Sequence, residues 1–570
     1  MATTIPTKIS TPTDLRDWLR RVDALGELQT VRGANTEEDI GMATELLGRT
    51  RPSKATVFDK IKGYKKGFRV LSNGLGSFGR IAVTLGLDPK ASPHELVRMW
   101  QERVRKGIAT IPAEVVKDGP VFENVLRGDQ VDCLIFPTPK WHEFDGGRYL
   151  GTGSFDITRD PDEGWVNLGT YRVMVHDKTR LGFYISPGKH GRQHRDKWFA
   201  RKEKMPLAFC AGGDPLLFLA ACTEIPYGTT EYDWAGGVRG APYRVMKGPV
   251  TGLPIPADAE IVMEGWVDPE EREVEGPFGE WTGYYASGER AEPVFRVEAI
   301  YHRNDPIILA SPPNVPPDEQ SFYRAFMRSA RLRGDIEAAS IPGIVGVWCH
   351  EVGGSRLFNA ISINQRYAGH ARQVGHAAAS VHTGAYLGRY TVVVDDDIDV
   401  MDLEQVLWAM CTRRGRARST RASTPTRRGS ARGRSSTRRA PGSGATASRC
   451  HSSRHPRQSA RPSSAGAGSS AKERSRRTCP EHEQGDDGVT GTARARIGAW
   501  MPWSTSSRAK SRTRTDISTS HVRSAADART GLGSAGSSSR PAEAAGSCGR
   551  APSRRPSRTA PRSSTGRLAS

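Results

Sequence analysis

The spacing of apolar residues near the N-terminus predicts an amphipathic helix over residues 13–25. Leu15, Trp18, Leu19 and Val22 follow one another at i, i+3, i+4 and i+7, which places them on one face. Thr13 precedes them as a candidate N-cap. Mixed helix and strand signals then lead to a second helical pattern over residues 93–107. Residues 1–115 are therefore predicted to form an N-terminal α/β domain.

Between residues 116 and 315 the pattern changes to short β-type runs separated by Gly, Pro and Asp. The clearest runs are residues 171–175, 181–186, 259–267 and 294–302. Regular short strands with turn signals between them indicate a β-barrel or a sandwich. An apolar run at 215–222 is too short to cross a bilayer, so it is predicted to be buried core.

A Pro-rich boundary at 311–320 precedes a return to α/β alternation. A strand is predicted at 389–397 and a helix at 401–413. The apolar face of that helix is predicted to consist of Leu403, Val406, Leu407 and Met410. Residues 316–413 are therefore predicted to form a C-terminal α/β domain.

The last 157 residues differ from the rest of the chain in composition. Residues 414–570 hold 33 Lys and Arg against 8 Asp and Glu and contain no Phe or Tyr, whereas residues 1–413 have a net charge of −4. So few apolar residues cannot offset the entropy cost of folding, and this tail is predicted to be disordered.

Three interpretations of the tail compete. A functional nucleic-acid-binding tail is expected to carry RGG or RS repeats or interleaved aromatics, which are missing here. A solvated linker is the second. The third, which we favour, is a frameshift, because GC-rich codons read out of frame yield Arg, Ser, Ala, Gly, Pro and Thr with almost no Lys. A frameshift implies that the native C-terminal piece of the last domain is missing.

Other features of the sequence favour a cytoplasmic protein. The eight cysteines form no CxxC pair, which argues against a disulfide framework and a zinc site. The N-terminus lacks the apolar stretch of a signal peptide, and no segment is long enough to span a membrane.

The stretch "EVEGPFGEWTGYYASGER" (273–290) places two carboxylates, Glu275 and Glu280, around a tight turn. Nearby rings raise the pKa of an acid by desolvation, so one of these groups could remain protonated near neutral pH and donate a proton. The rings concerned are those of Phe278, Trp281, Tyr284 and Tyr285. The alternative is a hairpin turn with two solvated acids.

A second cluster, residues 165–194, carries Asn167, Arg172, Lys189 and His190. Cationic and amide groups suit a phosphate or carboxylate, and Asn with His also suits a metal such as Mn²⁺. On an unbroken strand Asn167 and Arg172 point to opposite faces. They can share a site only if Gly169 marks a bulge or a new strand begins after it. The alternative is an exposed basic hairpin.

The motifs "NLGTYR", "PGKHGRQH" and "EGPFGEWTGYY", in this order and spacing, resemble the UbiD-like decarboxylase family. The resemblance runs to about residue 413. It implies an N-terminal α/β region, a central split β-barrel that binds prenylated FMN, and a C-terminal α/β domain. It also implies reversible non-oxidative decarboxylation of an aromatic or α,β-unsaturated carboxylic acid, and the aromatics after Glu280 favour an aryl substrate.

The resemblance also implies roles for individual residues. Glu280 is the implied proton donor, while Arg172 binds the substrate carboxylate and hydrogen-bonds to Glu275, so that Arg172, Glu275 and Glu280 form the catalytic set. Arg389 falls about where the family places a basic residue on the flavin phosphate. The other implied cofactor-binding residues are Asn167, Leu168, Gly169, Thr170, Tyr171, Arg172, Lys189 and His190.

The family's metal site is similar to an Asn-His-Glu set. Asn167 and His190 match it, but Pro249 stands where the Glu is expected, so a Mn²⁺ ion relies on phosphate and water there or binds more weakly. The resemblance further implies K⁺, a flavin prenyltransferase as cofactor supplier, and a dimer or hexamer, with no membrane or specific nucleic-acid partner. The alternatives are a nucleic-acid-binding protein that acts through its tail and an inactive, frameshifted decarboxylase.

Overall fold

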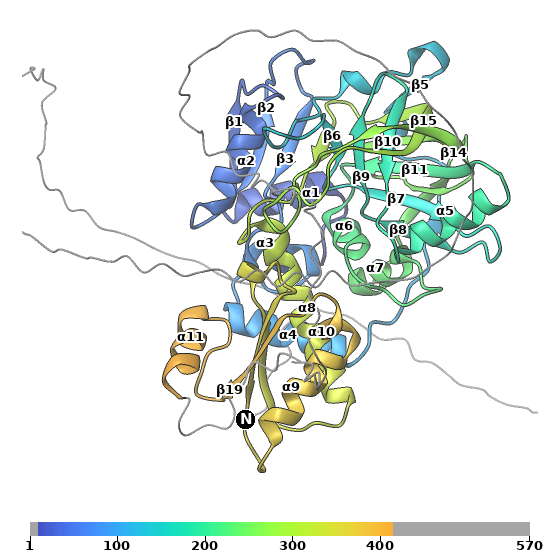
Figure 1. Ribbon diagram of the computed structural model, residues 1–570. Helices are drawn as coiled ribbons and strands as arrows, with labels where there is room; N and C mark the ends of the chain where they lie inside the picture. The colour runs from blue at the N-terminus through green and yellow to red at the C-terminus, as the bar shows by residue number, and fades with distance from the viewer. Residues whose placement is uncertain (1–9, 414–570) are drawn as a thin grey trace, which may run out of the picture. The chain divides into compact units, whose positions relative to one another are not determined.

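The computed structural model describes residues 10–413, coloured from blue to orange in Figure 1. The expectations of disorder and of a frameshift over residues 414–570 lie outside the described residues. Everything described belongs to one compact unit, Met1–Pro462.

Helix α1 (Leu15–Ala24) confirms the first predicted helix, and its four predicted apolar residues are all buried. Its N-cap, however, is Asp14 and not Thr13. The Asp14 carboxylate accepts a hydrogen bond from the Asp17 N–H at 2.7 Å, whereas the Thr13 N–H donates to the Asp17 side chain. A carboxylate one residue closer to the first turn is better placed to receive its free N–H groups.

The N-terminal sheet has the strand order β1-β2-β3-β16, and its last strand comes from a distant part of the sequence. β16 (Ile307–Leu309) lies in the segment predicted as barrel, yet it pairs in parallel with β3. The remaining elements of this region are β1 (Leu28–Arg32), β2 (Ala55–Asp59), β3 (Arg69–Ser72), α2 (Asp39–Arg49), α3 (Phe78–Leu85) and α4 (Pro93–Arg105). The chain therefore returns to its first sheet after completing the barrel.

The central region is an antiparallel sheet with the order β6-β9-β10-β15-β14-β11-β7-β8, and β5 pairs with β15 beside this path. Its strands are β5 (Asn124–Arg127), β6 (Tyr149–Gly151), β7 (Phe155–Arg159), β8 (Val166–Gly169), β9 (Arg172–Val175), β10 (Arg180–Tyr184), β11 (Met205–Ala211), β14 (Ile261–Glu275) and β15 (Arg290–His302). Within residues 10–413 the end strands β6 and β8 do not pair with each other. The curled sheet stays open, which confirms the predicted split barrel (Figure 1).

Smaller elements surround this sheet. A three-stranded sheet has the order β13-β12-β4. Its strands, and the helices in the same part of the chain, are β4 (Glu114–Val115), β12 (Arg244–Lys247), β13 (Pro254–Pro256), α5 (His190–Ala200), α6 (Pro215–Ala221), α7 (Glu231–Arg239) and the 3₁₀ turns η1 (Pro120–Glu123), η2 (Gly128–Gln130) and η3 (Cys133–Ile135).

The C-terminal part has its own sheet, β17-β18-β19, in which β17 and β18 are antiparallel and β18 and β19 parallel. Its long helix α8 (Glu319–Ala338) follows the Pro-rich boundary and begins with a capping box made by Asp318 and Ser321. The other elements are β17 (Ile344–Cys349), η4 (Glu351–Gly353), β18 (Phe358–Ile363), α9 (His370–Ser380), α10 (His382–Ala385), β19 (Tyr390–Asp395) and α11 (Leu403–Thr412). This mixed arrangement confirms the predicted α/β class of the region.

The buried face of α11 differs from the prediction. Val406 and Ala409 are buried, while Leu407 is 44% exposed and lies beside Trp408, which is 54% exposed. A helix of ten residues that packs along one narrow line buries an i, i+3 pair, and Leu407 is rotated away from that line. Of the predicted apolar face, Val406 is buried, Leu403 and Met410 are half-buried, and Leu407 is exposed.

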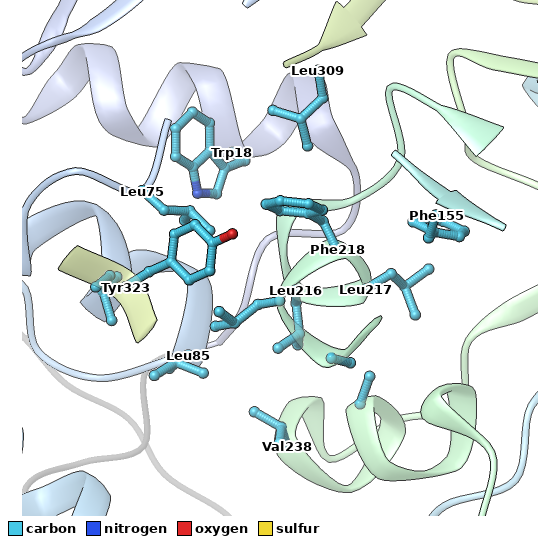
Figure 2. Packing of buried hydrophobic residues seen from close by; sticks show 14 of the residues in the cluster. Trp18, Leu75, Leu85, Phe155, Leu216, Leu217, Phe218, Val238, Leu309 and Tyr323 are labelled. Carbon is cyan, nitrogen blue, oxygen red and sulfur yellow. The ribbon is translucent and has the colours of Figure 1, made fainter. Parts of the chain in front are cut away.

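The run 215–222 becomes helix α6, and its residues Pro215 to Ala220 are buried, as predicted. Figure 2 shows Phe218 of this helix among side chains that include Trp18 of α1 and Tyr323 of α8. The rings of Phe218 and Tyr323 lie 5.8 Å apart, centroid to centroid. In residues 10–413 no helix has both the length and the apolar character that spanning a membrane requires.

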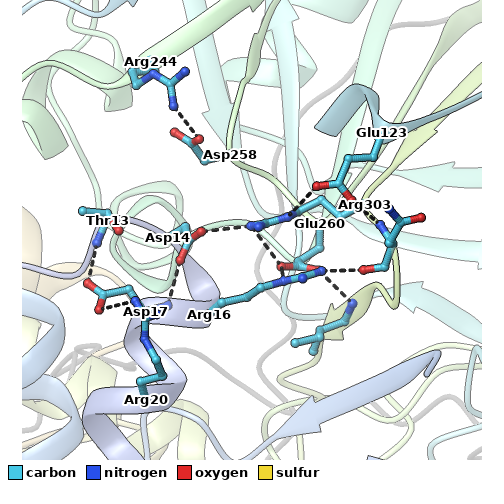
Figure 3. Close-up of polar contacts among 12 residues, drawn as sticks. Thr13, Asp14, Arg16, Asp17, Arg20, Glu123, Arg244, Asp258, Glu260 and Arg303 are labelled. Atoms are coloured by element: carbon cyan, nitrogen blue, oxygen red, sulfur yellow. Dashed lines mark hydrogen bonds and ion pairs between the residues drawn. The ribbon is translucent and has the colours of Figure 1, made fainter. Parts of the chain in front are cut away.

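A buried ion-pair network fixes α1 to the barrel (Figure 3). Arg16 donates two hydrogen bonds to the fully buried Glu260, at 2.7 and 2.8 Å. Arg303 donates to Asp14 at 2.9 Å and lies 3.5 Å from Glu260. Because Glu260 directly precedes β14, the network fixes the start of the long strand that ends in Glu275.

Candidate active site

Arg172 lies between the two predicted acids. It begins β9. Glu275 ends β14, and in the sheet β10 and β15 lie between these two strands. Its Nη2 donates to Glu275 Oε2 at 2.8 Å and its Nη1 donates to Glu280 Oε1 at 3.0 Å. The guanidinium carbon is 4.4 Å from the ring centroid of Tyr184, which faces Arg172 in the β9–β10 register. One guanidinium thus joins both carboxylates.

Glu275 is the fixed member of this set. Its side chain is only 1% exposed, and its second oxygen, Oε1, accepts a hydrogen bond from the Tyr149 hydroxyl at 2.9 Å. Tyr149 is itself buried and packs on Phe278 with ring centroids 4.1 Å apart. With both oxygens bound to protein donors, Glu275 is held in one place.

Glu280 is the accessible member. It lies in the loop between β14 and β15, where its N–H donates to the Tyr284 carbonyl at 3.1 Å and its carbonyl accepts from the Gly283 N–H at 2.8 Å. Its side chain is 30% exposed. Burial raises the pKa of Glu280, opposed by the Arg172 charge and assisted by Glu275. The alternative of two solvated acids is therefore wrong.

Only part of the predicted aromatic cluster surrounds Glu280. Phe278 and Trp281 line the same cavity as Glu280. Tyr284 is 52% exposed, and the Tyr285 hydroxyl accepts a hydrogen bond from the Phe144 N–H at 3.2 Å. Four rings were predicted to desolvate the acid, but only Phe278 and Trp281 line the cavity with Glu280.

The cavity next to this set has a volume of about 740 Å³. Eight of the nine residues predicted to hold the cofactor line it, and Arg389 does not. The eight are Asn167, Leu168, Gly169, Thr170, Tyr171, Arg172, Lys189 and His190. Arg389 is instead exposed just before β19, where its N–H donates to the Leu357 carbonyl. The structure therefore brings together the two sequence clusters but leaves Arg389 outside their cavity.

A break between two strands allows Asn167 and Arg172 to share the cavity. β8 ends at Gly169 and β9 begins at Arg172, so a new strand starts after the glycine, the second of the two arrangements expected. Tyr171, within this break, accepts hydrogen bonds at its hydroxyl from Asn167 Nδ2 (3.3 Å) and from the Gly191 N–H of α5 (3.0 Å). This contact fixes the loop relative to the start of α5.

The buried carboxyl of Asp156 supports the same loop. Its Oδ2 accepts a hydrogen bond from the Tyr171 N–H at 3.1 Å. Complete burial raises the pKa of Asp156 well above its ordinary range. Asp156 therefore holds the break in place by accepting the N–H of Tyr171.

An acid lines the cavity together with Asn167 and His190. Pro249 does not line the cavity, whereas Glu231, the first residue of α7, does. The Glu231 carboxylate accepts a hydrogen bond from the Leu168 N–H at 2.6 Å. Burial raises the pKa of Glu231 to about 8. Helix α7 thus brings Glu231 to the cavity, while the expectation for a metal ligand at Pro249 stays a prediction.

No metal site is evident from clustering of acids, cysteines and histidines alone. Among residues 10–413 no three such side chains gather in a group that could hold an ion. Asn167 adds an amide oxygen to His190 and Glu231, and all three line the cavity. Burial and the neighbouring Lys189 charge lower the pKa of His190, which favours the neutral imidazole that metals bind.

The sequence reasoning also missed three arginines in the cavity wall: Arg324, Arg331 and Arg356. The first two lie on α8, and Arg356 lies between η4 and β18. The sequence did contain a signal, since arginines at 324, 328 and 331 recur at i, i+4 and i+7 and share one helix face.

Three family models cover the described chain in order. They represent the N-terminal domain, the Rift-related domain and the C-terminal domain of 3-octaprenyl-4-hydroxybenzoate carboxy-lyase, and they match residues 19–100, 114–316 and 321–429. The chain belongs to the UbiD family. It is a carboxy-lyase, and these matches give no support to the nucleic-acid-binding alternative.

Curated relatives in this family are decarboxylases. The pyrrole-2-carboxylic acid decarboxylase of Pseudomonas aeruginosa is 33% identical over 411 residues, which cover 70% of this chain and 82% of the relative. A phenolic acid decarboxylase of Sedimentibacter hydroxybenzoicus is 34% identical over 419 residues, with 70% and 84% covered.

Solved structures of the family share the fold, and one of them is in complex with prFMN. The open form of Sedimentibacter hydroxybenzoicus vanillic acid decarboxylase matches with a TM-score of 0.65 at 31% identity and covers 71% of this chain and 85% of that one. An evolved dimeric form of the UbiD-class enzyme HmfF from Pelotomaculum thermopropionicum, in complex with prFMN, matches with a TM-score of 0.64 at 28% identity, covering 70% and 90%.

Proposed function

We propose that this chain catalyses the reversible, non-oxidative decarboxylation of an aromatic or α,β-unsaturated carboxylic acid, with prenylated FMN bound in the 740 Å³ cavity. The observation that carries the proposal is the unequal pair of acids on Arg172. Glu275 is buried and fully bound, while Glu280 lines the cavity with a raised pKa. One acid is built to stay in place and the other to exchange a proton.

The residues around Arg172 bind and orient the substrate. A guanidinium binds a carboxylate through two parallel hydrogen bonds, so Arg172 holds the substrate carboxylate beside Glu280. Tyr149 fixes Glu275, and Glu275 in turn fixes Arg172. Prenylated FMN, when bound, supplies an electron sink for the charge left on the carbon that loses CO₂.

Glu280 supplies the proton that replaces CO₂ on that carbon. Burial and the negative charge of Glu275 favour its protonated form, and Arg172 favours its ionised form. A substrate carboxylate on Arg172 draws the guanidinium away from Glu280, which leaves Glu280 more strongly in the protonated form that a general acid needs. In the carboxylation direction the same carboxylate removes the proton from the carbon.

Asn167, His190 and Glu231, which line the cavity, would hold a divalent metal. The donor set of one amide oxygen, one neutral imidazole and one carboxylate suits Mn²⁺. Glu231 supports this assignment because it is buried, its pKa is raised to about 8, and the structure gives it no cationic partner among residues 10–413. A divalent cation would supply that missing charge. Potassium is not part of the proposal.

An aromatic acid suits the walls of the cavity. Tyr184, Phe278 and Trp281 line it near Arg172 and Glu280, and flat rings of this kind pack on aromatic substrates. The relatives named above act on pyrrole-2-carboxylic, phenolic and vanillic acids, which have the same character.

Reconstitution tests the proposal. The protein is co-expressed with a flavin prenyltransferase, the proposed cofactor supplier, and compared with protein loaded with FMN alone, using pyrrole-2-carboxylate and vanillate as substrates. We expect CO₂ release only from the prenylated-flavin form. Equal activity with FMN, or a flavin-loaded enzyme that converts no aromatic acid, contradicts the proposal. The dimer or hexamer remains a prediction for size-exclusion chromatography of the same samples.

A further inference from the structure

Three cationic side chains at the cavity lack an acidic partner in the described structure. Lys189, Arg324 and Arg356 all line the 740 Å³ cavity. Within residues 10–413 none of them forms an ion pair with a carboxylate. They also line the neighbouring cavity of about 370 Å³, so they lie where the two spaces meet.

Arg356 is the most constrained of the three. Its guanidinium carbon lies 4.9 Å from the Trp281 ring centroid and 5.5 Å from that of Tyr386. Its Nε is buried and has no hydrogen-bond partner within the described chain. Burial, followed by the positive charges of Arg324 and Arg328, lowers the pKa of Arg356 to about 9. A buried donor that is repelled by like charges lacks its counter-ion.

The acids close to these cations are already engaged. Glu224 pairs with Arg328 at 3.3 Å and with His382 at 3.0 Å. Asp318 accepts hydrogen bonds from the N–H groups of Ser321 and Asn314, as the cap of α8. The protein therefore leaves an excess of positive charge at this wall.

A fourth cation, Arg331, shows the contrast. Arg331 also lines the cavity, but its guanidinium pairs with Asp335 at 3.1 Å, one turn further along α8. Its side chain is 51% exposed. Arg331 thus has an acidic partner and is exposed to solvent. It serves as a matched control for the three cations without an acidic partner.

We infer that Arg324 and Arg356, with Lys189, bind a second anionic group of the substrate, so that the enzyme acts on an aromatic acid carrying two acidic groups. The inference rests on the proposed decarboxylase function and names its substrate class. The C–C bond to the carboxylate on Arg172 breaks, CO₂ leaves, and the proton of Glu280 takes its place. The second acid stays on the product, which is a monoacid.

The flavin phosphate is the other source of such an anion, and the position of Arg356 favours the substrate. Arg356 packs on Trp281, the residue that directly follows the proton donor Glu280. The donors proposed for the metal, Asn167, His190 and Glu231, come instead from β8, α5 and α7. Arg356, Trp281 and Glu280 line the same cavity, so an anion held by Arg356 shares that cavity with the proton donor.

Binding to a variant without turnover provides the test. Flavin-loaded Glu280→Gln protein is titrated calorimetrically with pyrrole-2,5-dicarboxylate and pyrrole-2-carboxylate, and with terephthalate and benzoate. We expect each diacid to bind roughly 10- to 100-fold tighter than its monoacid, as hydrogen bonds to charged groups allow. Adding Arg356→Gln or Arg324→Gln reduces this ratio to about one. Arg356→Lys restores part of it, and Arg331→Gln leaves it unchanged.

Flavin content and thermal melting of each variant identify the source of the anion. Equal affinity for diacid and monoacid in the parent protein overturns the inference. So does a loss of flavin in Arg356→Gln with an unchanged diacid preference, which would assign the cations to the cofactor phosphate. If diacids bind selectively but no CO₂ is released by the wild-type enzyme, the proposed function fails and the subsite stands. If monoacids are decarboxylated without any diacid preference, the function stands and the subsite fails.

Discussion

Two clusters in this molecule are built from arginine and glutamate, but one holds structural elements together and the other lines a cavity. In the network of Figure 3, the fully buried Glu260 accepts two hydrogen bonds from Arg16, a third from the Ile307 N–H, and has Arg303 within 3.5 Å. In the candidate active site, Arg172 holds Glu275 and Glu280, but Glu280 keeps one side open to the cavity.

The difference lies in which atoms remain available. Every accepting direction of Glu260 faces a protein donor, so its charge only holds elements together. Glu280 combines one guanidinium contact with a wall of the cavity, and its pKa is raised by burial. A carboxylate with a pKa raised by burial becomes useful for proton transfer when it also lines a cavity that a ligand can enter.

The largest expected effect is a loss of activity when Glu280 in the candidate active site is changed. Glu280→Gln keeps the shape of the side chain and removes its transferable proton, so kcat should fall by about 10²- to 10⁴-fold. The melting temperature and flavin content should stay close to wild type. Steady-state rates of CO₂ release from reconstituted enzyme measure this change, and a kcat within threefold of wild type would remove Glu280 from its role.

The matching change in the other cluster should affect stability. Glu260→Gln breaks a buried pair whose Arg16 partner is 32% exposed, so we expect a loss of about 2–4 kcal/mol in the free energy of unfolding. Activity per folded molecule should be retained. Glu271→Gln, which removes a surface pair with Arg296, is the control and should cost less than about 1 kcal/mol. Denaturant unfolding measures both, and equal losses would contradict the assigned role of Glu260.

Tyr149→Phe tests whether Glu275 must be fixed. Losing the hydroxyl leaves a buried carboxylate oxygen without its donor, which should cost about 1–3 kcal/mol of stability. Glu275 then holds Arg172 less firmly, Arg172 turns more to Glu280, and its charge lowers the pKa of Glu280. The pH–rate profile should lose activity at lower pH than wild type. A purely structural tyrosine would change stability and leave the profile in place.

The smallest effect concerns stability against pH. The pKa of Glu280 is raised above its ordinary value of 4.5, so the folded protein keeps a proton that the unfolded chain has lost. Stability should therefore fall as pH rises from 4.5 through the raised pKa, and kcat should fall over the same range. In Glu280→Gln this part of the pH dependence should vanish. Urea unfolding at several pH values measures it, and identical profiles would show that the raised pKa does not govern folding.

Local features were predictable from the sequence because their causes are local. The spacing of Leu15, Trp18, Leu19 and Val22 fixes one helix face, and the turn between Glu275 and Glu280 brings both acids near one another. Exposed Leu407 shows the limit, since apolar spacing alone does not say how wide a contact a helix makes.

Distant contributions to the site could not be predicted in the same way. Glu231 reaches the cavity only because α7 packs beside β8, where the Leu168 N–H contacts its carboxylate. Arg356 arrives from the C-terminal part of the chain and is recognisable only once Trp281 lies beneath it. The motifs around Asn167 and His190 carry no local signal for Glu231, because it lies more than 35 residues away in the sequence.

A single-turnover experiment tests most directly whether Glu280 delivers the proton. Prenylated-FMN-loaded Glu280→Gln is mixed with an excess of an acid that the wild-type enzyme converts, and CO₂ and product are measured from the same reaction. We expect a fast release of at most one equivalent of CO₂ per site, followed by product formation about 10²- to 10⁴-fold slower than in wild type, which releases both in equal amounts over many turnovers. Continuous release of both from the variant, in equal amounts and at a rate near wild type, would contradict it.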